Sequence, residues 1–207
     1  ATLPSKLEKA LHWSPTINKE QKEVIRYILW NMVYVEGGTA NLGDNNNYPV
    51  DVASFFINRY EVSQDEWYVI MGENPSNQHR RNYPVDQVNW FNAQRFTKKL
   101  SQLSGLPFRL PFEAEWEYAA RGGVKTKNFI YAGSNNAEQV AWFREKYYNT
   151  YVSKETGTKK PNELGLYDMS GNVYEWCMDW YDRKVPFTGN IAPVISEKDT
   201  HKVLRGG

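Results

Sequence analysis

Residues 162–181 read Asn-Glu-Leu-Gly-Leu-Tyr-Asp-Met-Ser-Gly-Asn-Val-Tyr-Glu-Trp-Cys-Met-Asp-Trp-Tyr. Polar and apolar residues alternate too irregularly here to predict an amphipathic helix or strand. Gly171-Asn172 indicates a turn, because both residue types accept a positive φ. The carboxylates of Asp168 and Glu175, with carbonyls of the turn, could converge on a hard cation such as calcium. The alternative is a buried turn whose acids accept hydrogen bonds from backbone N–H groups, since the regular calcium-loop pattern of alternating acids is missing.

The size and composition of the chain exclude several classes of protein. Its 207 residues are enough for one domain with a substantial core, and 25 Lys and Arg against 24 Asp and Glu give no support for a nucleic-acid partner. No apolar run reaches about 18 residues, so no membrane span is expected. Residues 1–20 lack the apolar core of a signal peptide, as an already processed chain would. The single cysteine, Cys177, excludes an internal disulfide and a zinc site built from cysteines.

Helix signals are clear at several places. Asn18, Ser63 and Asn89 precede amphipathic segments as N-cap residues, and Gly105 ends the last of these segments. The predicted helices cover residues 19–30, 64–71, 90–104 and 113–121. The predicted strands cover 32–35, 50–60 and 202–205, residues 124–160 are expected to be mostly loop with brief strands, and 181–200 a long connection. We interpret the chain as a lead-in and helix over 1–31 followed by one domain over 32–207.

Three acidic residues on the helix predicted over 113–121 suggest acid–base chemistry. Residues two apart on a helix point to different faces, so Glu113, Glu115 and Glu117 do not form one carboxylate pair. We expect at least one of them to be buried and to pair with backbone N–H groups or with Arg109 or Arg121.

Few other residues suggest catalytic or metal chemistry. Cys177 lies between two apolar residues, which would raise the pKa of its thiol and predicts a buried, structural cysteine. The three histidines lie far apart in the sequence, so no histidine metal site is expected. Within the best-defined motifs, the residues predicted to lie in the core are Leu110, Trp116 and Trp176.

A set of motifs follows in order along residues 32–207. The most specific are Gly-Leu-Tyr-Asp-Met-Ser-Gly-Asn-Val-Tyr-Glu-Trp over 165–176 and Arg-Leu-Pro-Phe-Glu-Ala-Glu-Trp-Glu-Tyr-Ala-Ala-Arg-Gly-Gly over 109–123. Tyr-Glu-Val-Ser over 60–63 and Leu-Arg-Gly-Gly over 204–207 belong to the same set. Together they resemble the formylglycine-generating enzyme, or sulfatase-modifying factor, family.

The resemblance implies a fold and a chemistry. The fold would be α+β of the formylglycine-generating type, a C-type-lectin-like variant with small antiparallel sheets, few short helices and much ordered loop. Enzymes of this family oxidise a substrate cysteine with a copper(I) ion held by two cysteines just beyond an Arg-Gly-Gly-Ser motif. This chain reaches Arg205-Gly206-Gly207, and Cys177 matches neither cysteine. We therefore expect a domain incomplete at its C-terminus, with copper bound only if residues beyond Gly207 supply the pair.

Two functions follow from the resemblance. The first is a noncatalytic binding or assembly module with a protein, peptide or glycan ligand. The alternative is a copper-dependent oxidase that converts peptidyl cysteine to formylglycine, completed by residues beyond Gly207. Iron-dependent sulfoxide synthases that contain this domain are disfavoured, because their histidine-rich partner domain is absent. An extracytoplasmic location, in the cell envelope or secreted, is expected.

The resemblance also predicts a structural calcium site by position. Its ligands would be the carboxylates of Asp168 and Glu175 and the main-chain carbonyls of Gly171 and Val173. Two carboxylates brought close together without an ion repel each other, so a cation would stabilise the pair. An Arg or Lys that neutralises them is the alternative.

Overall fold

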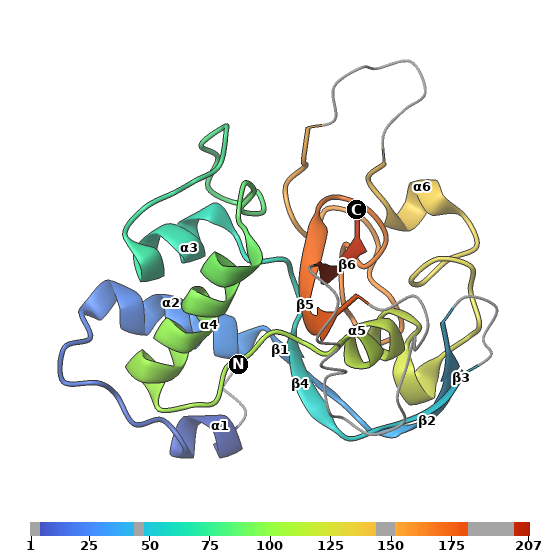
Figure 1. Cartoon of the computed structure of the whole chain (residues 1–207), viewed down its shortest axis with the longest axis horizontal. Helices are drawn as coiled ribbons and strands as arrows, with labels where there is room; N and C mark the ends of the chain where they lie inside the picture. Colours follow the sequence, from blue (N-terminus) through green and yellow to red (C-terminus); the bar gives the residue numbers. More distant parts are fainter. Residues whose placement is uncertain (1–4, 44–47, 144–151, 182–200) are drawn as a thin grey trace.

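The computed structural model describes residues 5–43, 48–143, 152–181 and 201–207. Figure 1 shows α1–α4 gathered on one side of the molecule and α5 with the paired strands on the other. The helices are α1 (Ser5–Lys9), α2 (Lys19–Trp30), α3 (Gln64–Met71), α4 (Trp90–Ser104), α5 (Glu113–Ala120), the short 3-10 helix η2 (Gly123–Lys125) and α6 (Ala137–Val140). The strands are β1 (Met32–Val35), β2 (Gly38–Leu42), β3 (Tyr48–Val52), β4 (Phe55–Asn58), β5 (Tyr174–Trp180) and β6 (Lys202–Gly206).

The predicted helices are confirmed, and their ends agree to within one residue. Asn18 caps α2 and Ser63 caps α3, each in a capping box with the residue three positions later. Asn89 caps α4, and Gly105 ends it with a positive φ of 74°. Local side-chain chemistry therefore sets the ends of these three helices.

Helices α2, α3 and α4 bury one apolar face each in a shared helical cluster. Its buried members include Ile25, Leu29, Ile70 and Phe96, and Trp67 stacks on Phe96 with ring centroids 5.0 Å apart. Helix α2 packs against α3, which lies in the domain predicted over 32–207. The boundary predicted at residue 31 stays a prediction.

The segment predicted as one strand over 50–60 is two strands. β3 pairs with β2, and β4 pairs with β1, both antiparallel, so the chain forms one long hairpin with a bend in each arm. The bend lies where Gly37 packs on residues 53–54: a Cβ at Gly37 would come within 2.5 Å of the Val52 carbonyl oxygen. The prediction missed this break because only the contact across the hairpin reveals it.

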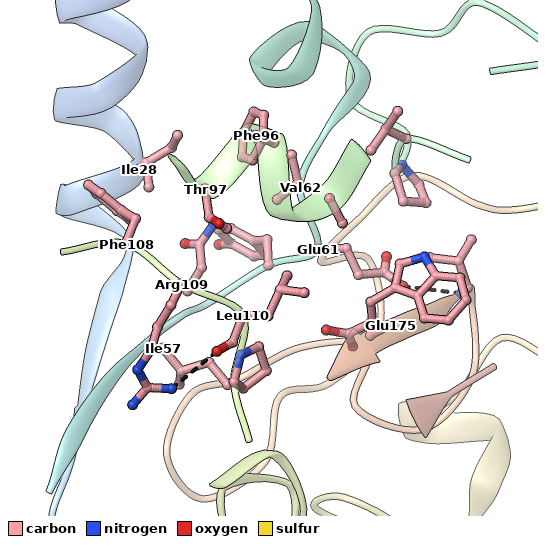
Figure 2. Close-up of a pocket in the computed structure, with 18 of the residues that line it drawn as sticks. Ile28, Ile57, Glu61, Val62, Phe96, Thr97, Phe108, Arg109, Leu110 and Glu175 are labelled. Atoms are coloured by element: carbon pink, nitrogen blue, oxygen red, sulfur yellow. Dashed lines mark hydrogen bonds between the residues drawn. The ribbon is translucent and has the colours of Figure 1, made fainter. Parts of the chain in front are cut away.

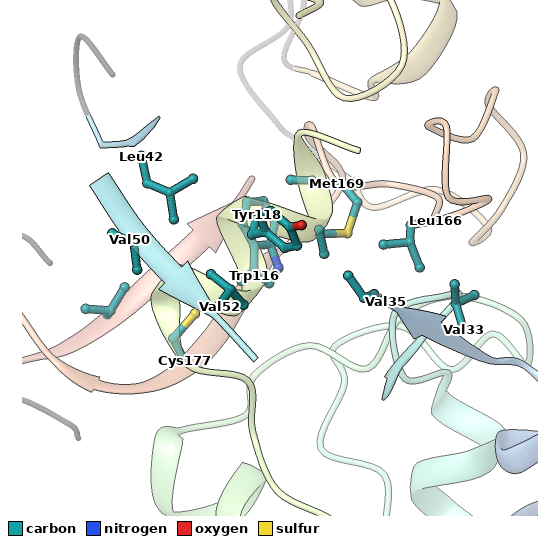
Figure 3. Packing of buried hydrophobic residues seen from close by; sticks show 13 residues of the cluster. Val33, Val35, Leu42, Val50, Val52, Trp116, Tyr118, Leu166, Met169 and Cys177 are labelled. Atoms are coloured by element: carbon teal, nitrogen blue, oxygen red, sulfur yellow. The ribbon is translucent and has the colours of Figure 1, made fainter. Parts of the chain in front are cut away.

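A second core, the sheet cluster, surrounds α5. Trp116 and Tyr118 of α5 pack with Val35, Val52 and Cys177, as Figure 3 shows. Trp116 is 5 % exposed, which confirms its predicted place in the core. For Leu110 and Trp176 the prediction is wrong in part: both are only partly buried, because they line a cavity between the two clusters.

The segment 162–181 contains a strand that its sequence did not predict. β5 pairs with β6, but the register shifts between Trp176 and Trp180, and this irregularity disrupts the alternation expected of a strand. In the described part of 124–160, the only bridge is between Tyr131 and Ser134, and α6 was not predicted. The predicted connection over 181–200 lies almost entirely outside the described residues. The small antiparallel sheets, short helices and long ordered loops confirm the α+β fold class.

Candidate functional site

Asn162 anchors the start of the loop that carries the candidate calcium ligands. Its side chain is 5 % exposed, donates to the carbonyl oxygens of Ala119 and Ala120 at 2.7 and 3.2 Å, and accepts from the N–H groups of Leu164 and Leu166. These bonds help to satisfy carbonyls at the C-terminal end of α5, where the carbonyl of Ala119 also accepts from the N–H of Gly122. The loop is thereby fixed to the sheet cluster just before Asp168.

Asp168 is buried, and only one of its two carboxylate oxygens accepts a hydrogen bond from a described residue. Oδ2 accepts a 2.7 Å hydrogen bond from the N–H of Gly157, whereas Oδ1 has no hydrogen-bond partner among the described residues. Burial raises the pKa of Asp168, and the bond from Gly157 partly offsets this. A buried acceptor without a donor costs free energy, and a cation would satisfy it.

The turn at Gly171-Asn172 is held from two sides. A Cβ at Gly171, whose φ is 108°, would come within 2.3 Å of the Trp142 carbonyl oxygen, so only glycine fits there. The N–H of Asn172 donates to that same carbonyl at 2.8 Å. In the side chain of Asn172, Oδ1 accepts from the N–H of Lys154 and Nδ2 donates to Glu61 Oε2 at 2.6 Å.

Glu175 faces the cavity from β5. Burial raises the pKa of its carboxyl to about 7; the nearby indole N–H of Trp116 lowers it and the charge of Asp168 raises it. That N–H makes no hydrogen bond among the described residues, so it lowers the pKa of Glu175 as a nearby dipole. Gly206 lies beside this carboxylate, since its Cβ would stand 3.7 Å from Glu175 Oε1 and 3.0 Å from the Val173 carbonyl oxygen.

Glu61 is a buried acid that the sequence did not single out as a site residue. Its pKa is raised well above the ordinary value by burial, then by the charges of Glu175 and Asp168, while hydrogen bonds from Val173 and Asn172 lower it. The buried carboxyls of Glu61 and Asp168 and the half-buried carboxyl of Glu175 are therefore near enough for their charges to interact. The only signal in the sequence was its place in the Tyr-Glu-Val-Ser motif.

Of the four residues predicted for calcium, three present oxygens that suit a cation, whereas the carbonyl of Gly171 accepts a 3.3 Å hydrogen bond from the N–H of Gly207. Asp168 has an unsatisfied oxygen, Glu175 has a carboxyl that is costly to ionise, and Val173 and Glu175 both lie beside Gly206. Within the described ranges no three His, Cys, Asp or Glu side chains group closely enough to hold a metal ion. A cation here would thus depend on main-chain carbonyls as well as on the two carboxylates, which suits calcium.

A cavity of about 1120 Å³ adjoins the loop and separates the two clusters (Figure 2). Most of its wall is apolar, with Ile28 and Phe96 on the helical side and Ile57 on the other. Glu61 and Glu175 form its acidic side. An apolar wall with a few polar groups at one side is typical of a binding site.

Comparisons with known proteins identify the family of the chain. A family model described as "Sulfatase-modifying factor enzyme 1-like domain" matches residues 19–207. The chain belongs to this family. "Chaperone protein LppX" of Paenibacillus barcinonensis is 35 % identical, over 73 % of this chain and 72 % of that protein. The formylglycine-generating enzyme of Streptomyces coelicolor is 34 % identical over 62 % of this chain, but the alignment spans only 42 % of the enzyme.

Solved structures lead to the same family. "Treponema denticola variable protein 1" has a TM-score of 0.61 and 30 % identity over 73 % of both chains. "Crystal Structure of CarF" has a TM-score of 0.63 and 27 % identity, over 75 % of this chain and 82 % of that one. The chain also matches about a third of "Serine/threonine-protein kinase pkn1" of Chlamydia pneumoniae, at 30 % identity. The family thus occurs in proteins with differently named activities, so membership does not assign one to this chain.

The sulfatase-modifying factor domain of this chain has one thiol, and it is buried. Cys177 is 0 % exposed, and burial first, then the charge of Glu175, raises its pKa well above the ordinary value. The predicted structural cysteine is therefore confirmed. Such a thiol is neither a ready nucleophile nor an accessible ligand for copper.

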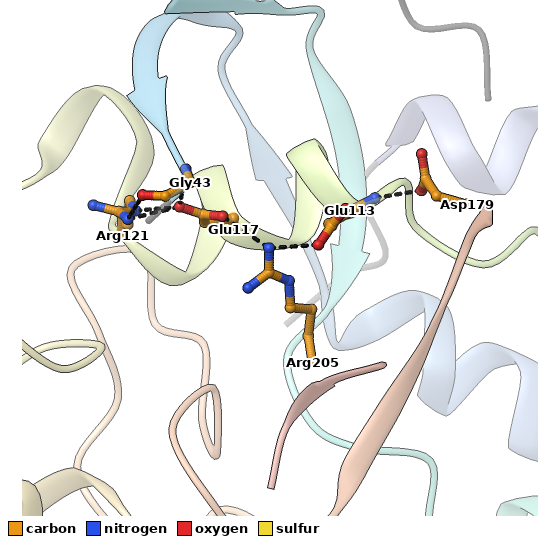
Figure 4. Close-up of polar contacts among 6 residues, drawn as sticks. All are labelled: Gly43, Glu113, Glu117, Arg121, Asp179 and Arg205. Carbon is orange, nitrogen blue, oxygen red and sulfur yellow. Dashed lines mark hydrogen bonds and ion pairs between the residues drawn. The ribbon is translucent and has the colours of Figure 1, made fainter. Parts of the chain in front are cut away.

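The acids of α5 have structural partners, as expected. Glu115 accepts two 2.7 Å hydrogen bonds from the guanidinium of Arg109. Glu117 pairs with Arg121 at 2.6 Å, and Arg205 lies between Glu113 and Glu117, as Figure 4 shows. These bidentate and shared pairs fix α5 to β6 and leave no free acid–base pair among the three.

Proposed function

We propose that this chain is a noncatalytic binding or assembly module of the sulfatase-modifying factor family. The observation that carries the proposal is the single, fully buried thiol, Cys177. The resemblance implies that the oxidase reaction needs copper(I) on a pair of thiolates, and one buried thiol cannot replace such a pair. The alternative is the copper-dependent oxidase, for which residues beyond Gly207 would have to supply both cysteines.

A direct activity assay separates these two functions. The 207-residue chain, loaded with copper(I), is given a peptide that contains Cys-x-Pro-x-Arg, with the Streptomyces coelicolor enzyme as positive control. We expect no formylglycine above background by mass spectrometry, because no thiolate pair is present. Formylglycine that disappears in the Cys177→Ser variant would contradict the proposal.

The cavity supports a polypeptide as the ligand. Consecutive residues 54–58 line it, which occurs when a strand presents its edge, because alternate side chains point to opposite faces. In the described sheets β4 pairs only with β1, so its other edge is open to an extended segment. Arg109, which is paired with Glu115, is the only Arg or Lys among the described residues of the wall, and Asp86 adds a carboxylate, so the wall favours basic over acidic side chains. The printed name of LppX, a chaperone, agrees with polypeptide binding.

This binding can be tested by filling the cavity. Thr97 lies on its wall, whereas the adjacent Lys98 is exposed. For a fluorescent hexapeptide of alternating isoleucine and lysine, Thr97→Trp should weaken binding at least tenfold, and Lys98→Trp, which adds the same bulk outside, should not. Equal binding by both variants, or a native structure whose own chain fills the cavity, would contradict this site.

We further propose that calcium binds the loop through the carboxylates of Asp168 and Glu175 and the carbonyls of Gly171 and Val173. The ion would neutralise carboxylates that otherwise repel each other and would satisfy Asp168 Oδ1. An extracytoplasmic location, where calcium is plentiful, agrees with such a site. In the part of the chain that the structure describes, no helix is long and apolar enough to cross a bilayer.

A further inference from the structure

Glu61 lies outside the candidate calcium loop, yet both of its carboxylate oxygens accept hydrogen bonds from residues of that loop. The residue is 7 % exposed and stands between β4 and α3, more than a hundred positions before the loop in the sequence. Oε2 accepts from Asn172 Nδ2 at 2.6 Å, and Oε1 accepts from the N–H of Val173 at 3.1 Å. Because N–H donors already hold both oxygens, Glu61 is poorly placed to be a metal ligand itself.

These two hydrogen bonds act on the part of the loop between the candidate carbonyl ligands. Asn172 has a φ of 65°, a left-handed conformation that a non-glycine residue keeps only when its surroundings hold it. Its N–H points to the Trp142 carbonyl, and in a trans peptide the carbonyl of Gly171 then points the opposite way. The N–H of Val173 belongs to the peptide that carries the carbonyl of Asn172, so its bond to Glu61 fixes the plane between the two candidate carbonyls. The carbonyl of Gly171 itself accepts a 3.3 Å hydrogen bond from the N–H of Gly207.

We propose that Glu61 is a positioning residue for calcium: through Asn172 and Val173 it holds the turn so that the carbonyls of Gly171 and Val173 converge with Asp168 and Glu175. This inference rests on the proposed calcium site. Groups that orient metal ligands from behind typically contribute tenfold to a hundredfold to metal affinity. Glu61 also lines the cavity, so calcium binding and the shape of the cavity wall are linked through this side chain.

The test is a double-mutant cycle on calcium affinity. Terbium luminescence, excited through the nearby Trp116 and displaced by calcium, reports binding to the intact chain. Glu61→Gln keeps the size of the side chain, but its amide has only one oxygen to accept the two hydrogen bonds that the carboxylate accepts from Asn172 and Val173. Asn172→Gly removes the partner amide, keeps the charge of Glu61 and accepts the positive φ. Each variant should weaken calcium binding at least tenfold, and the double variant should be little weaker than either.

The outcomes separate positioning from charge alone. If Glu61 acted only through its negative charge, Glu61→Gln would weaken binding while Asn172→Gly would not, and that result overturns the inference. Additive losses overturn it as well. Faster hydrogen exchange of the Val173 amide in calcium-free Glu61→Gln, with the protein still folded by circular dichroism, supports it. Failure of the unmodified chain to bind terbium or calcium would overturn the calcium site itself, and the inference with it.

Discussion

The helical cluster and the loop-rich region around α5 are built by different means. In α2–α4 the buried side chains are mostly apolar, and most polar bonds are local, such as the capping box of Asn18 and Gln21; buried Gln64, which donates to the carbonyl of Pro84, is an exception. Around α5, polar side chains are buried and their partners are distant in sequence, as for Glu117, which accepts from the N–H of Gly43 at 2.8 Å. The helical half depends on apolar burial, and the loop-rich half depends also on whether each buried polar group has a partner.

The same contrast explains where function is expected. A helix with one apolar face is stabilised by packing that face against its neighbours. Asp168 and Glu175 are instead acids that the protein alone does not fully stabilise. Unsatisfied groups of this kind are what a ligand or an ion can complete, so the loop-rich half is where calcium, pH and a partner should act.

The largest expected effect comes from removing the central side chain of the loop-rich half. Trp116 is 5 % exposed and packs in the sheet cluster while touching the candidate calcium region. Trp116→Ala should lower the free energy of unfolding by about 3–5 kcal/mol, because a large buried side chain is lost and a cavity remains. Urea denaturation measures this loss. The exposed Tyr68 of α3 provides the control, since Tyr68→Ala should change stability by less than about 0.5 kcal/mol.

A smaller effect should appear as pH dependence in calcium-free protein. The pKa of Glu175 is about 7 in the folded chain, against 4.5 when unperturbed. Between these values the folded state holds a proton that the unfolded state has released, so stability is highest near pH 4.5 and falls as pH rises to 7. The fall should be at most about 3.5 kcal/mol, because the two pKa values differ by about 2.5 units and each unit corresponds to roughly 1.4 kcal/mol.

Urea denaturation in EDTA at several pH values measures how steeply the free energy of unfolding falls with pH. Glu175→Gln should make this slope smaller. Glu61 and Asp168 act in the same direction, because burial raises their pKa values too. Substitution of Glu23, an exposed acid on α2, by Gln should leave the slope unchanged. Stability that increases with pH through this window would show that the carboxylates are neutralised by groups of the protein itself.

The sequence predicted the helical half better than the loop-rich half. The ends of α2, α3 and α4 were predictable because caps and apolar periodicity lie within the helix itself. The bend at Gly37 and the strand β5 were not, because each depends on a partner elsewhere in the chain. For the candidate site, the resemblance supplied Asp168 and Glu175, whereas the contacts of Glu61 with the loop span more than a hundred positions and leave no local pattern in the sequence.

Calcium should stabilise the loop-rich half more than the helical half. If the ion binds only the folded chain, it stabilises by mass action, by about 2.7 kcal/mol at a calcium concentration one hundred times the Kd. The Tm should therefore rise with calcium and fall with EDTA. Asp168→Ala combined with Glu175→Gln should abolish the increment, because both carboxylate ligands are gone, whereas Glu23→Gln on α2 should keep it. Local stability should divide in the same way: hydrogen exchange in 162–176 should slow more than in α2–α4, since the ion completes groups that only the loop-rich half leaves unsatisfied. An unchanged Tm on chelation, or equal slowing in both halves, would mean that the buried acids are satisfied without an ion.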